Sequence, residues 1–277
     1  MNAIFITGAS TGIGLAVTQL LAERGNAVYA GVRSDADAQR LAALHKLIRP
    51  VRVDVTDAAS LQAAIAQITT DGATLTGVVA NAGVAIAGPL EFIPLEQLRT
   101  QMEINVIGVV ATIQAAMPEL RKSKGRIVIV GSIAGRMAPP FVGPYGASKF
   151  AIEAITDCLR IELRPFGISV SLIEPGAVKT PIWQKGRNRA ATLAPQFPPT
   201  VLEYYGDAIA ALQALSASEE AHGIPPLAVA LKIHHALNAS HPKPRYICGT
   251  PAKVQAILAR LPESIRDAIM RRVMRIP

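Results

Sequence analysis

A regular alternation of short β-branched runs with longer segments of helical period most constrains what this chain can fold into. Six runs are expected to form strands: Ala3–Thr7, Ala27–Val32, Ile48–Val53, Gly77–Ala80, Arg126–Gly131 and Ile168–Glu174. Four segments between them place apolar residues at i, i+3 and i+4, as amphipathic helices do: Ile13–Arg24, Ala58–Thr69, Leu95–Leu120 and Tyr145–Leu163. This order predicts an α/β fold with a doubly wound parallel sheet, covered by helices on both faces.

The regular pattern ends near Gly176, and the last hundred residues are organised differently. A segment rich in proline, alanine and polar residues, about 180–226, contains one convincing helical pattern at Leu202–Leu215, and we interpret it as a substrate lid. A strand at Arg245–Cys248 and two helices, Ala252–Leu261 and Ser264–Val273, complete the chain. With 277 residues, half of them hydrophobic, residues 1–277 are expected to form a single domain.

The two cysteines exclude several classes of protein. Cys158 and Cys248 are far apart and fit neither a metal-ligand spacing nor a disulfide framework, so no metal site is expected. The N-terminus lacks a basic region, and its apolar run is too short for a signal core or a membrane span. A cytoplasmic location is therefore expected.

The net charge of +8 is concentrated near the C-terminus. The segment His241–Pro277 holds eight Lys and Arg residues against Glu263 and Asp267, a net +6. Such a face could contact anionic lipid or nucleic acid, but a solvated helix face or a subunit contact is the preferred interpretation. Aromatic residues make up 4% of the chain and do not alternate with the basic ones, so neither nucleic-acid binding nor peripheral membrane contact is expected.

A glycine-rich turn follows the first predicted strand. Gly8, Gly12 and Gly14, with Ser10, Thr11 and Ile13 between them, lead directly into the first predicted helix. Glycines there let the backbone approach a pyrophosphate, and the positive helix N-terminus attracts it. Alone, the same glycines could serve only the geometry of the turn.

The spacing Gly-x-x-x-Gly-x-Gly resembles the turn of the short-chain dehydrogenase/reductase family. Further motifs of that family follow in order: Asp54, Asn81-Ala82-Gly83, Asn105, Ser132 and Tyr145-Gly-Ala-Ser-Lys149. The resemblance covers nearly all of residues 1–180 and implies a Rossmann fold, a nicotinamide cofactor, an alcohol or ketone substrate, and a dimer or tetramer. The segment Pro244–Gly249 is similar, more weakly, to the hydroxysteroid and retinol dehydrogenase branch.

The end of the second predicted strand, Val32-Arg33-Ser34, bears on the choice of cofactor. Val32 stands where NAD enzymes of the family carry Asp, and Arg33 could bind a 2′-phosphate, so NADP(H) is predicted over NAD(H). Alternatively, Arg33 stacks on adenine without discriminating, since Thr11 lacks the second basic residue of many NADP enzymes. The resemblance places Asp54 at the adenine edge and Val55 beside it, although Asp54 could also be a structural residue before Thr56.

Tyr145 and Lys149 lie four residues apart in a predicted helix, so their side chains share one face. A nearby ammonium and a cationic nicotinamide would lower the tyrosine pKa from about 10, which predicts Tyr145 as the acid/base. Ser132 would donate a hydrogen bond to the same substrate oxygen. The resemblance adds that Lys149 contacts the nicotinamide ribose and that Asn105 holds a water in a proton relay.

Two further segments are expected near the reacting centre. After the sixth strand, Pro175, Gly176, Val178 and Thr180 could fix the carboxamide of the cofactor, or could form an ordinary strand-ending turn with a helix cap. Four apolar side chains suggest a hydrophobic steroid-, retinoid- or aromatic-like alcohol or ketone, although each could equally be packing: Met137, Phe141, Val142 and Trp183.

Three other functions compete with that of an alcohol or ketone oxidoreductase. A non-catalytic NADP(H)-binding sensor would not need intact Ser132, Tyr145 and Lys149. A protein acting through its basic tail is disfavoured by the scarcity of aromatic residues. A sugar-nucleotide epimerase or dehydratase typically adds a larger C-terminal domain than this chain has room for. The sequence therefore favours the oxidoreductase.

Overall fold

The computed structural model describes residues 1–276 and is built on one seven-stranded parallel sheet. The strands are β1 (Asn2–Ile6), β2 (Ala27–Val32), β3 (Ile48–Arg52), β4 (Thr74–Ala80), β5 (Arg126–Val130), β6 (Ser169–Pro175) and β7 (Arg245–Cys248). Their order is β3-β2-β1-β4-β5-β6-β7, and every neighbouring pair is parallel. The predicted doubly wound Rossmann fold is confirmed. The strand order changes direction between β1 and β4. Ligands of such sheets bind at this point, beyond the carboxyl ends of the strands.

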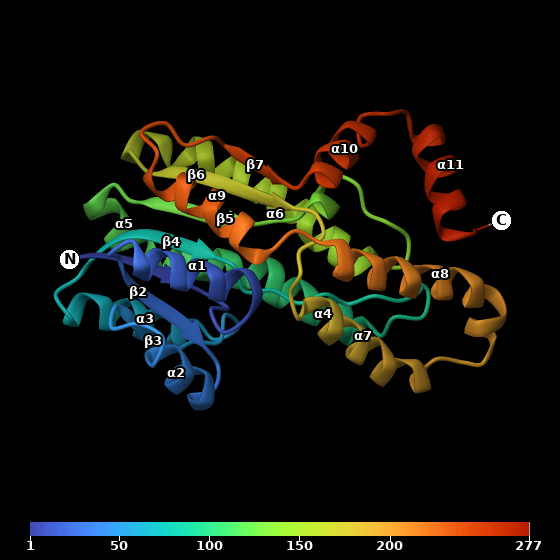
Figure 1. Cartoon of the computed structure of the whole chain (residues 1–277), viewed down its shortest axis with the longest axis horizontal. Helices are drawn as coiled ribbons and strands as arrows, with labels where there is room; N and C mark the ends of the chain where they lie inside the picture. Colours follow the sequence, from blue (N-terminus) through green and yellow to red (C-terminus); the bar gives the residue numbers. More distant parts are fainter. Residues whose placement is uncertain (277) are drawn as a thin grey trace.

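Helices cover both faces of the sheet (Figure 1). One face carries α1 (Gly12–Glu23), α2 (Asp35–Ala42) and α9 (Pro226–Asn238); the other carries α3 (Ala58–Thr70), α5 (Gly108–Ser123) and α6 (Gly143–Glu162). Alternate strand residues supply the two cores, as the period of two requires: Ile4 and Ile6 pack toward α1, and Phe5 packs toward α3 and α5. All three are buried.

Two of these helices, α2 and α9, were absent from the sequence-based prediction. In α9, Val229, Ala230 and Ile233 are completely buried, and the helix packs along α1. Pro225 and Pro226 had marked this region as irregular. Proline is nevertheless well tolerated in the first turn of a helix, where its missing N–H has no intrahelical partner, and α9 begins at Pro226.

The segment predicted as a lid with one helix contains two, so that prediction was wrong in part. Helix α7 (Ile182–Leu193) precedes α8 (Thr200–His222), and both extend beyond the carboxyl edge of the sheet (Figure 1). Helix α7 escaped detection because it buries only Leu193 and so carries almost no apolar period. An ion pair of 2.6 Å between Arg187 Nη2 and Glu220 Oε2 joins the two helices.

The long helix predicted at 95–120 is continuous but irregular. Helix α4 (Leu95–Met102) passes into α5 through η1 (Glu103–Ile107), a turn of π-helix. Such turns insert an extra residue and are frequent at functional sites. This one contains Asn105.

The C-terminal part closes the fold with short elements. Helices α10 (Thr250–Leu258) and α11 (Glu263–Met274) follow β7. Their bounds lie within a few residues of the predicted ones. Short 3₁₀ turns occur at η2 (Ile133–Gly135), η3 (Arg164–Phe166) and η4 (Ala194–Gln196). Over residues 1–276, no helix is both long and apolar enough to cross a bilayer. Cys158 and Cys248 are unpaired, and that same range contains no metal-binding cluster of His, Cys, Asp or Glu.

Candidate active site

The glycine turn between β1 and α1 is packed so tightly that side chains are excluded. A Cβ on Gly14 would lie 2.2 Å from the Gly8 carbonyl oxygen and 2.6 Å from Asn81 Nδ2. Gly8 has a φ of +66°, which favours glycine. The Asn81 amide donates to the carbonyls of Thr7 and Gly8 at 3.0 and 3.1 Å. The motif after β4 thus fixes the turn after β1.

Thr7 has a role that sequence reasoning missed. Its hydroxyl, fully buried, accepts hydrogen bonds from the backbone N–H groups of Asn81 and Ala82, both at 3.1 Å. These bonds tie the ends of β1 and β4 together at the switch point. The threonine before the first glycine is the only sequence signal, because its partners lie more than 70 residues away.

The N-terminus of α1 is free to bind an anion. Thr11 occupies the N-cap position but makes no capping hydrogen bond, and Ser10, Thr11, Gly12 and Ile13 are all partly exposed. The first N–H groups of a helix lack intrahelical acceptors, and phosphate oxygens satisfy them well. The packed glycines and the uncapped helix together fit the pyrophosphate of a dinucleotide.

The loop after β6 reaches the same place. A Cβ on Gly12 would lie 3.0 Å from Thr180 Cγ2, so Thr180 covers the glycine turn. Val178 is buried and forms an isolated parallel bridge with Ile224. Pro175 ends β6, and the Gly176 N–H donates to Cys248 O at 3.2 Å. The segments predicted to bind the pyrophosphate and the carboxamide of the cofactor are therefore close in space.

At the end of β2, Arg33 is exposed and Ser34 caps α2. The Ser34 hydroxyl accepts from the Asp37 N–H at 3.1 Å. Nearby, Asp54 Oδ1 accepts from the N–H and hydroxyl of Thr56 at 3.0 and 2.7 Å, which is the structural alternative considered for this residue. The Thr56 backbone bond lowers the Asp54 pKa most, and Arg33 contributes.

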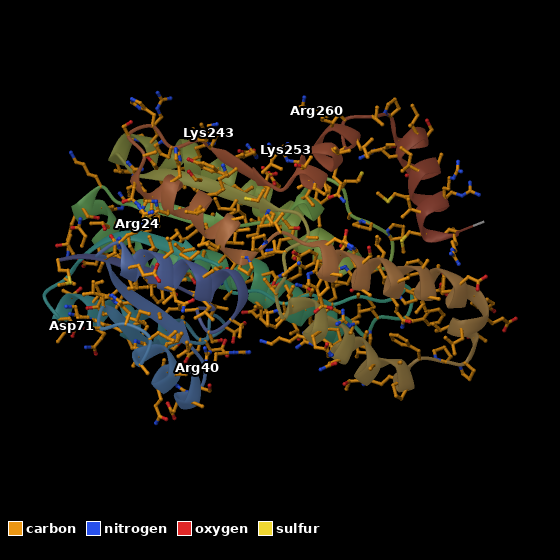
Figure 2. All side chains as sticks on the ribbon, in the orientation of Figure 1. Arg24, Arg40, Asp71, Lys243, Lys253 and Arg260 are labelled. Carbon is orange, nitrogen blue, oxygen red and sulfur yellow. The ribbon has the colours of Figure 1, made fainter. Side chains whose placement is uncertain are left out.

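Two further residues lie beside Asp54 and the glycine turn. Val55 is buried, and a Cβ on Gly108 would lie 2.7 Å from its Cγ2, so Val55 packs against the start of α5. Arg40, on α2, was missed by sequence reasoning (Figure 2). Its Nη2 donates to Ser10 O at 2.6 Å and pairs with Asp37 at 2.8 Å. A second cation therefore lies against the glycine turn, seven residues after Arg33.

Ser132, Tyr145 and Lys149 come together at the ends of β5 and α6. Ser132 follows β5, and its Oγ accepts from the Ala134 N–H at 3.1 Å. Tyr145 lies in the first turn of α6, with Lys149 Nζ 5.6 Å from its ring centroid. Lys149 is buried and donates to Val130 O, at the end of β5, at 2.9 Å. The two hydroxyls predicted to act on one oxygen, and the ammonium predicted beside them, are thus held by adjacent elements.

Burial controls the ionisation of this pair. Burial raises the pKa of Tyr145, and a hydrogen bond with Ser132 opposes that rise in part. Burial also lowers the pKa of Lys149 to about 8. Lys149 was expected to lower the tyrosine pKa; in the protein without cofactor, removal from water raises that pKa instead. Tyr145 is therefore a protonated phenol at neutral pH.

Asn105 connects α6 to the loop after β4. Its Oδ1 accepts from the Val84 N–H at 2.9 Å, and its Nδ2 donates to Val84 O at 2.9 Å and to Ser148 Oγ at 3.1 Å. Ser148 in turn donates to Tyr145 O at 2.7 Å. Next to this network, a Cβ on Gly83 would lie 3.3 Å from Asn105 Oδ1. The π-helical turn thus places an amide beside the helix that carries Tyr145.

The four predicted substrate residues lie on two segments. Met137, Phe141 and Val142 are partly buried in the loop between β5 and α6, and Phe141 adopts a φ of +66°. The Phe141 ring meets Tyr205 of α8 edge-on at 5.7 Å. Trp183 lies in the first turn of α7, and its Nε1 donates to Val178 O at 2.8 Å. Phe141 thus contacts α8, and Trp183 is tied to the loop after β6.

Comparison with known families agrees with this geometry. The family model described as short chain dehydrogenase matches residues 2–191, more than half of the chain. The chain belongs to the short-chain dehydrogenase family. This dehydrogenase is therefore an oxidoreductase of alcohols or ketones that uses a nicotinamide dinucleotide.

Three curated relatives show how the similarity is distributed. The chain is 35% identical to the NADPH-dependent 3-dehydrocapnine reductase of Ornithobacterium rhinotracheale, over 97% of this chain and 96% of that protein. It is 34% identical to 17-beta-hydroxysteroid dehydrogenase type 6 of Bos taurus, over 97% and 87%. It is 40% identical to the 3-amino-tetrahydro-pyrrolizinone reductase of Xenorhabdus hominickii, over 66% of this chain and 64% of that protein, slightly less than two thirds of its length.

Two solved structures of 25% identity share the fold and differ in cofactor. A short-chain dehydrogenase/reductase from Burkholderia phymatum in complex with NAD matches with a TM-score of 0.80 over 97% of this dehydrogenase and 95% of that chain. One from Burkholderia cenocepacia in complex with NADP matches with a TM-score of 0.73 over 98% and 96%. The fold therefore accommodates either cofactor, and selectivity depends on individual side chains.

Proposed function

We propose that this dehydrogenase transfers a hydride between NADP(H) and a hydrophobic alcohol or ketone, with Tyr145 as its acid/base. The observation that carries the proposal is that Ser132, Tyr145 and Lys149 converge at the carboxyl edge of the parallel sheet, the edge at which the tightly packed glycine turn after β1 also lies. A bound nicotinamide would supply or accept the hydride at the substrate carbon. A sensor that only binds the cofactor is the alternative, and measurable turnover would exclude it.

The side chains of the site divide the proton chemistry among them. Tyr145, kept protonated by burial, donates its proton to the carbonyl oxygen during reduction. The Ser132 hydroxyl donates a hydrogen bond to the same oxygen and stabilises the charge that develops there. Lys149 carries a positive charge close by and orients the cofactor ribose. We assign Asn105 to the proton relay that resupplies the pair.

Two arginines support NADP(H). Arg33 is exposed at the end of β2, where Val32 supplies no carboxylate to repel a phosphate. Arg40 lies against Ser10 in the glycine turn. The relative from Ornithobacterium rhinotracheale is named NADPH-dependent, whereas structures of similar fold hold NAD or NADP. Arg33 and Arg40 are therefore proposed to bind the 2′-phosphate.

Removing the side chain of either arginine should weaken the binding of NADPH more than the binding of NADH. We expect Arg33→Ala and Arg40→Ala each to raise the Kd of NADPH by roughly 10-fold, the effect of losing one charge-assisted contact at a partly exposed site. The Kd of NADH should change less than about twofold. Quenching of protein fluorescence on titration measures both, with Arg99→Ala, an exposed arginine of α4, as the control. Equal losses for the two cofactors would contradict the assignment.

The lid and the adjoining loop support a hydrophobic substrate. We propose residues 180–226 as a lid within a single domain of residues 1–277, and residues 241–277 as a C-terminal strand with basic helices. Met137, Phe141, Val142 and Trp183 are proposed to line the substrate site. NADPH oxidation against steroid, retinoid, aromatic and short aliphatic carbonyl compounds tests this, with NADH in parallel. Turnover restricted to short polar carbonyls would refute the hydrophobic assignment.

The direction of catalysis should depend on pH. Because the pKa of Tyr145 is raised, the phenol that donates a proton during reduction persists through neutral pH and is lost in the alkaline range. Oxidation of an alcohol needs the phenolate instead. We expect kcat for reduction to stay nearly constant between pH 7 and 10, while kcat for oxidation rises over the same range, measured in buffers of constant ionic strength. The same slope in both directions would contradict the assignment.

Other properties follow from family membership and remain proposals. Dimers or tetramers are expected, and light scattering of the purified protein would test this. A cytoplasmic location is also retained as a prediction.

A further inference from the structure

A partly buried network of charges outside the proposed catalytic residues joins four elements. Arg136, in the loop after η2, donates through Nε to Glu174 Oε1 and through Nη2 to Glu174 Oε2, the latter at 2.8 Å. Arg245, at the start of β7, donates to Glu153 of α6 at 2.9 Å and to Asp157 at 2.8 Å. Glu174 near the end of β6 is completely buried, and Glu153 is 16% exposed.

Two members of the network lie close in the chain to proposed active-site residues, one in the loop after β5 and one in α6. Arg136 follows Ser132 by four residues, and Glu153 follows Lys149 by one turn of α6. Between them, Gly135 lies directly on α6: a Cβ there would be 2.7 Å from Lys149 O and 3.2 Å from Glu153 Cγ. The loop that carries Ser132 is therefore held against the helix that carries Tyr145 and Lys149.

The two glutamates of the network interact with each other. Burial and the neighbouring Glu174 raise the pKa of Glu153 to about 7, against the opposing effect of Arg245. Within residues 1–276, Glu153 Oε1 is buried and has no hydrogen-bond partner. A proton on this atom would let it donate to Glu174, which satisfies the oxygen and removes the repulsion between two buried carboxylates.

We propose that Arg136, Glu174 and Glu153 form a proton-sharing clamp that positions the Ser132 loop against α6, and that ionisation of both carboxyl groups loosens it. The clamp is tightest when one proton is shared. Its members are positioning residues because they act through Ser132, Tyr145 and Lys149. The clamp depends on the proposed function only in the test that measures activity.

The groups facing Glu153 determine the sign of the pH effect. They are Glu174 from β6, Arg245 from β7, and Lys149 and Asp157 on α6 itself; Cys248 of β7 is near Glu174, and burial raises its pKa to about 11. The pKa of Glu153 is raised above that of an unfolded chain. The folded state therefore holds its proton more tightly, and the stability from this group is lost as pH rises toward 7.

Hydrogen exchange tests the clamp without any substrate. In the full-length protein, the amides of residues 133–142 should exchange about 3- to 30-fold faster at pH 8 than at pH 6 after correction for intrinsic rates. The variant Glu153→Gln, which cannot ionise, should lose this difference, whereas the surface control Glu96→Gln should retain it. No pH effect in the natural protein, or an unchanged effect in Glu153→Gln, would overturn the proposal.

Kinetics with a substrate found by the carbonyl panel test the positioning role. Arg136→Lys keeps the charge but loses the two-pronged contact, so kcat should fall about 10-fold while KM and the Kd of NADPH stay within twofold. Arg136→Gln/Glu174→Gln leaves no uncompensated buried charge and should fold with the same loss of kcat. Natural kcat in both variants would refute positioning. If no substrate is turned over but exchange behaves as expected, the proposed function fails and the clamp stands.

Discussion

Replacing Tyr145 with phenylalanine should lower kcat for carbonyl reduction by about 10³-fold, within the range by which positioned acids and bases accelerate reactions. The substitution removes the hydroxyl that lies beside Ser132 and keeps the aromatic ring in the first turn of α6. Cofactor binding should be nearly unchanged, because the glycine turn, Arg33 and Arg40 are untouched. Stopped-flow absorbance of NADPH measures the first effect, and fluorescence titration measures the second.

Tyr204→Phe is the matched control for this experiment. Tyr204 lies on α8, 62% exposed, and losing its hydroxyl should change kcat less than twofold. If Tyr145→Phe retained near-natural activity, the proton donor would have to be another group. If it also abolished NADPH binding, the loss of activity would not report on proton transfer.

Replacing Gly14 with alanine should abolish cofactor binding, raising the Kd of NADPH by more than about 100-fold. The new methyl carbon would lie 2.2 Å from the Gly8 oxygen and 2.6 Å from Asn81 Nδ2, far inside van der Waals contact. Neither atom can move away easily, because the Asn81 amide is hydrogen-bonded to Thr7 O and Gly8 O. The turn must therefore shift and displace the N–H groups that would bind phosphate. Isothermal titration calorimetry with NADPH measures the effect.

Gly206→Ala separates this effect from the general cost of adding a methyl group. Gly206 lies within α8, where a Cβ would meet nothing within 4 Å. Alanine there should raise the unfolding temperature slightly, since glycine inside a helix costs about 1 kcal/mol relative to alanine. Circular dichroism must show that Gly14→Ala is folded. A folded Gly14→Ala with natural NADPH affinity would exclude this turn as the cofactor site.

Sequence and structure agree most closely where the interactions are local. Strand β2 and strand β7 have the predicted bounds, and α6 carries Tyr145 and Lys149 on neighbouring turns. A spacing of four residues in a helix fixes this relation whatever the rest of the chain does. The lid helix α7 and the core helix α9 were missed for opposite reasons: α7 buries too little apolar surface to show a period, and α9 begins at prolines that marked a loop.

The sequence by itself determined the seven strands, the glycine turn and the residue types proposed for catalysis, because each depends on neighbours close by in the chain. Only the tertiary structure decided how Tyr145 ionises, since that depends on how much of it is removed from water. Likewise, Arg40 at Ser10 and the pair of Arg136 with Glu174 join residues about 30 to 40 positions apart. Contacts of this kind depend on which strands and helices the fold places side by side, and no local pattern of residues encodes that arrangement.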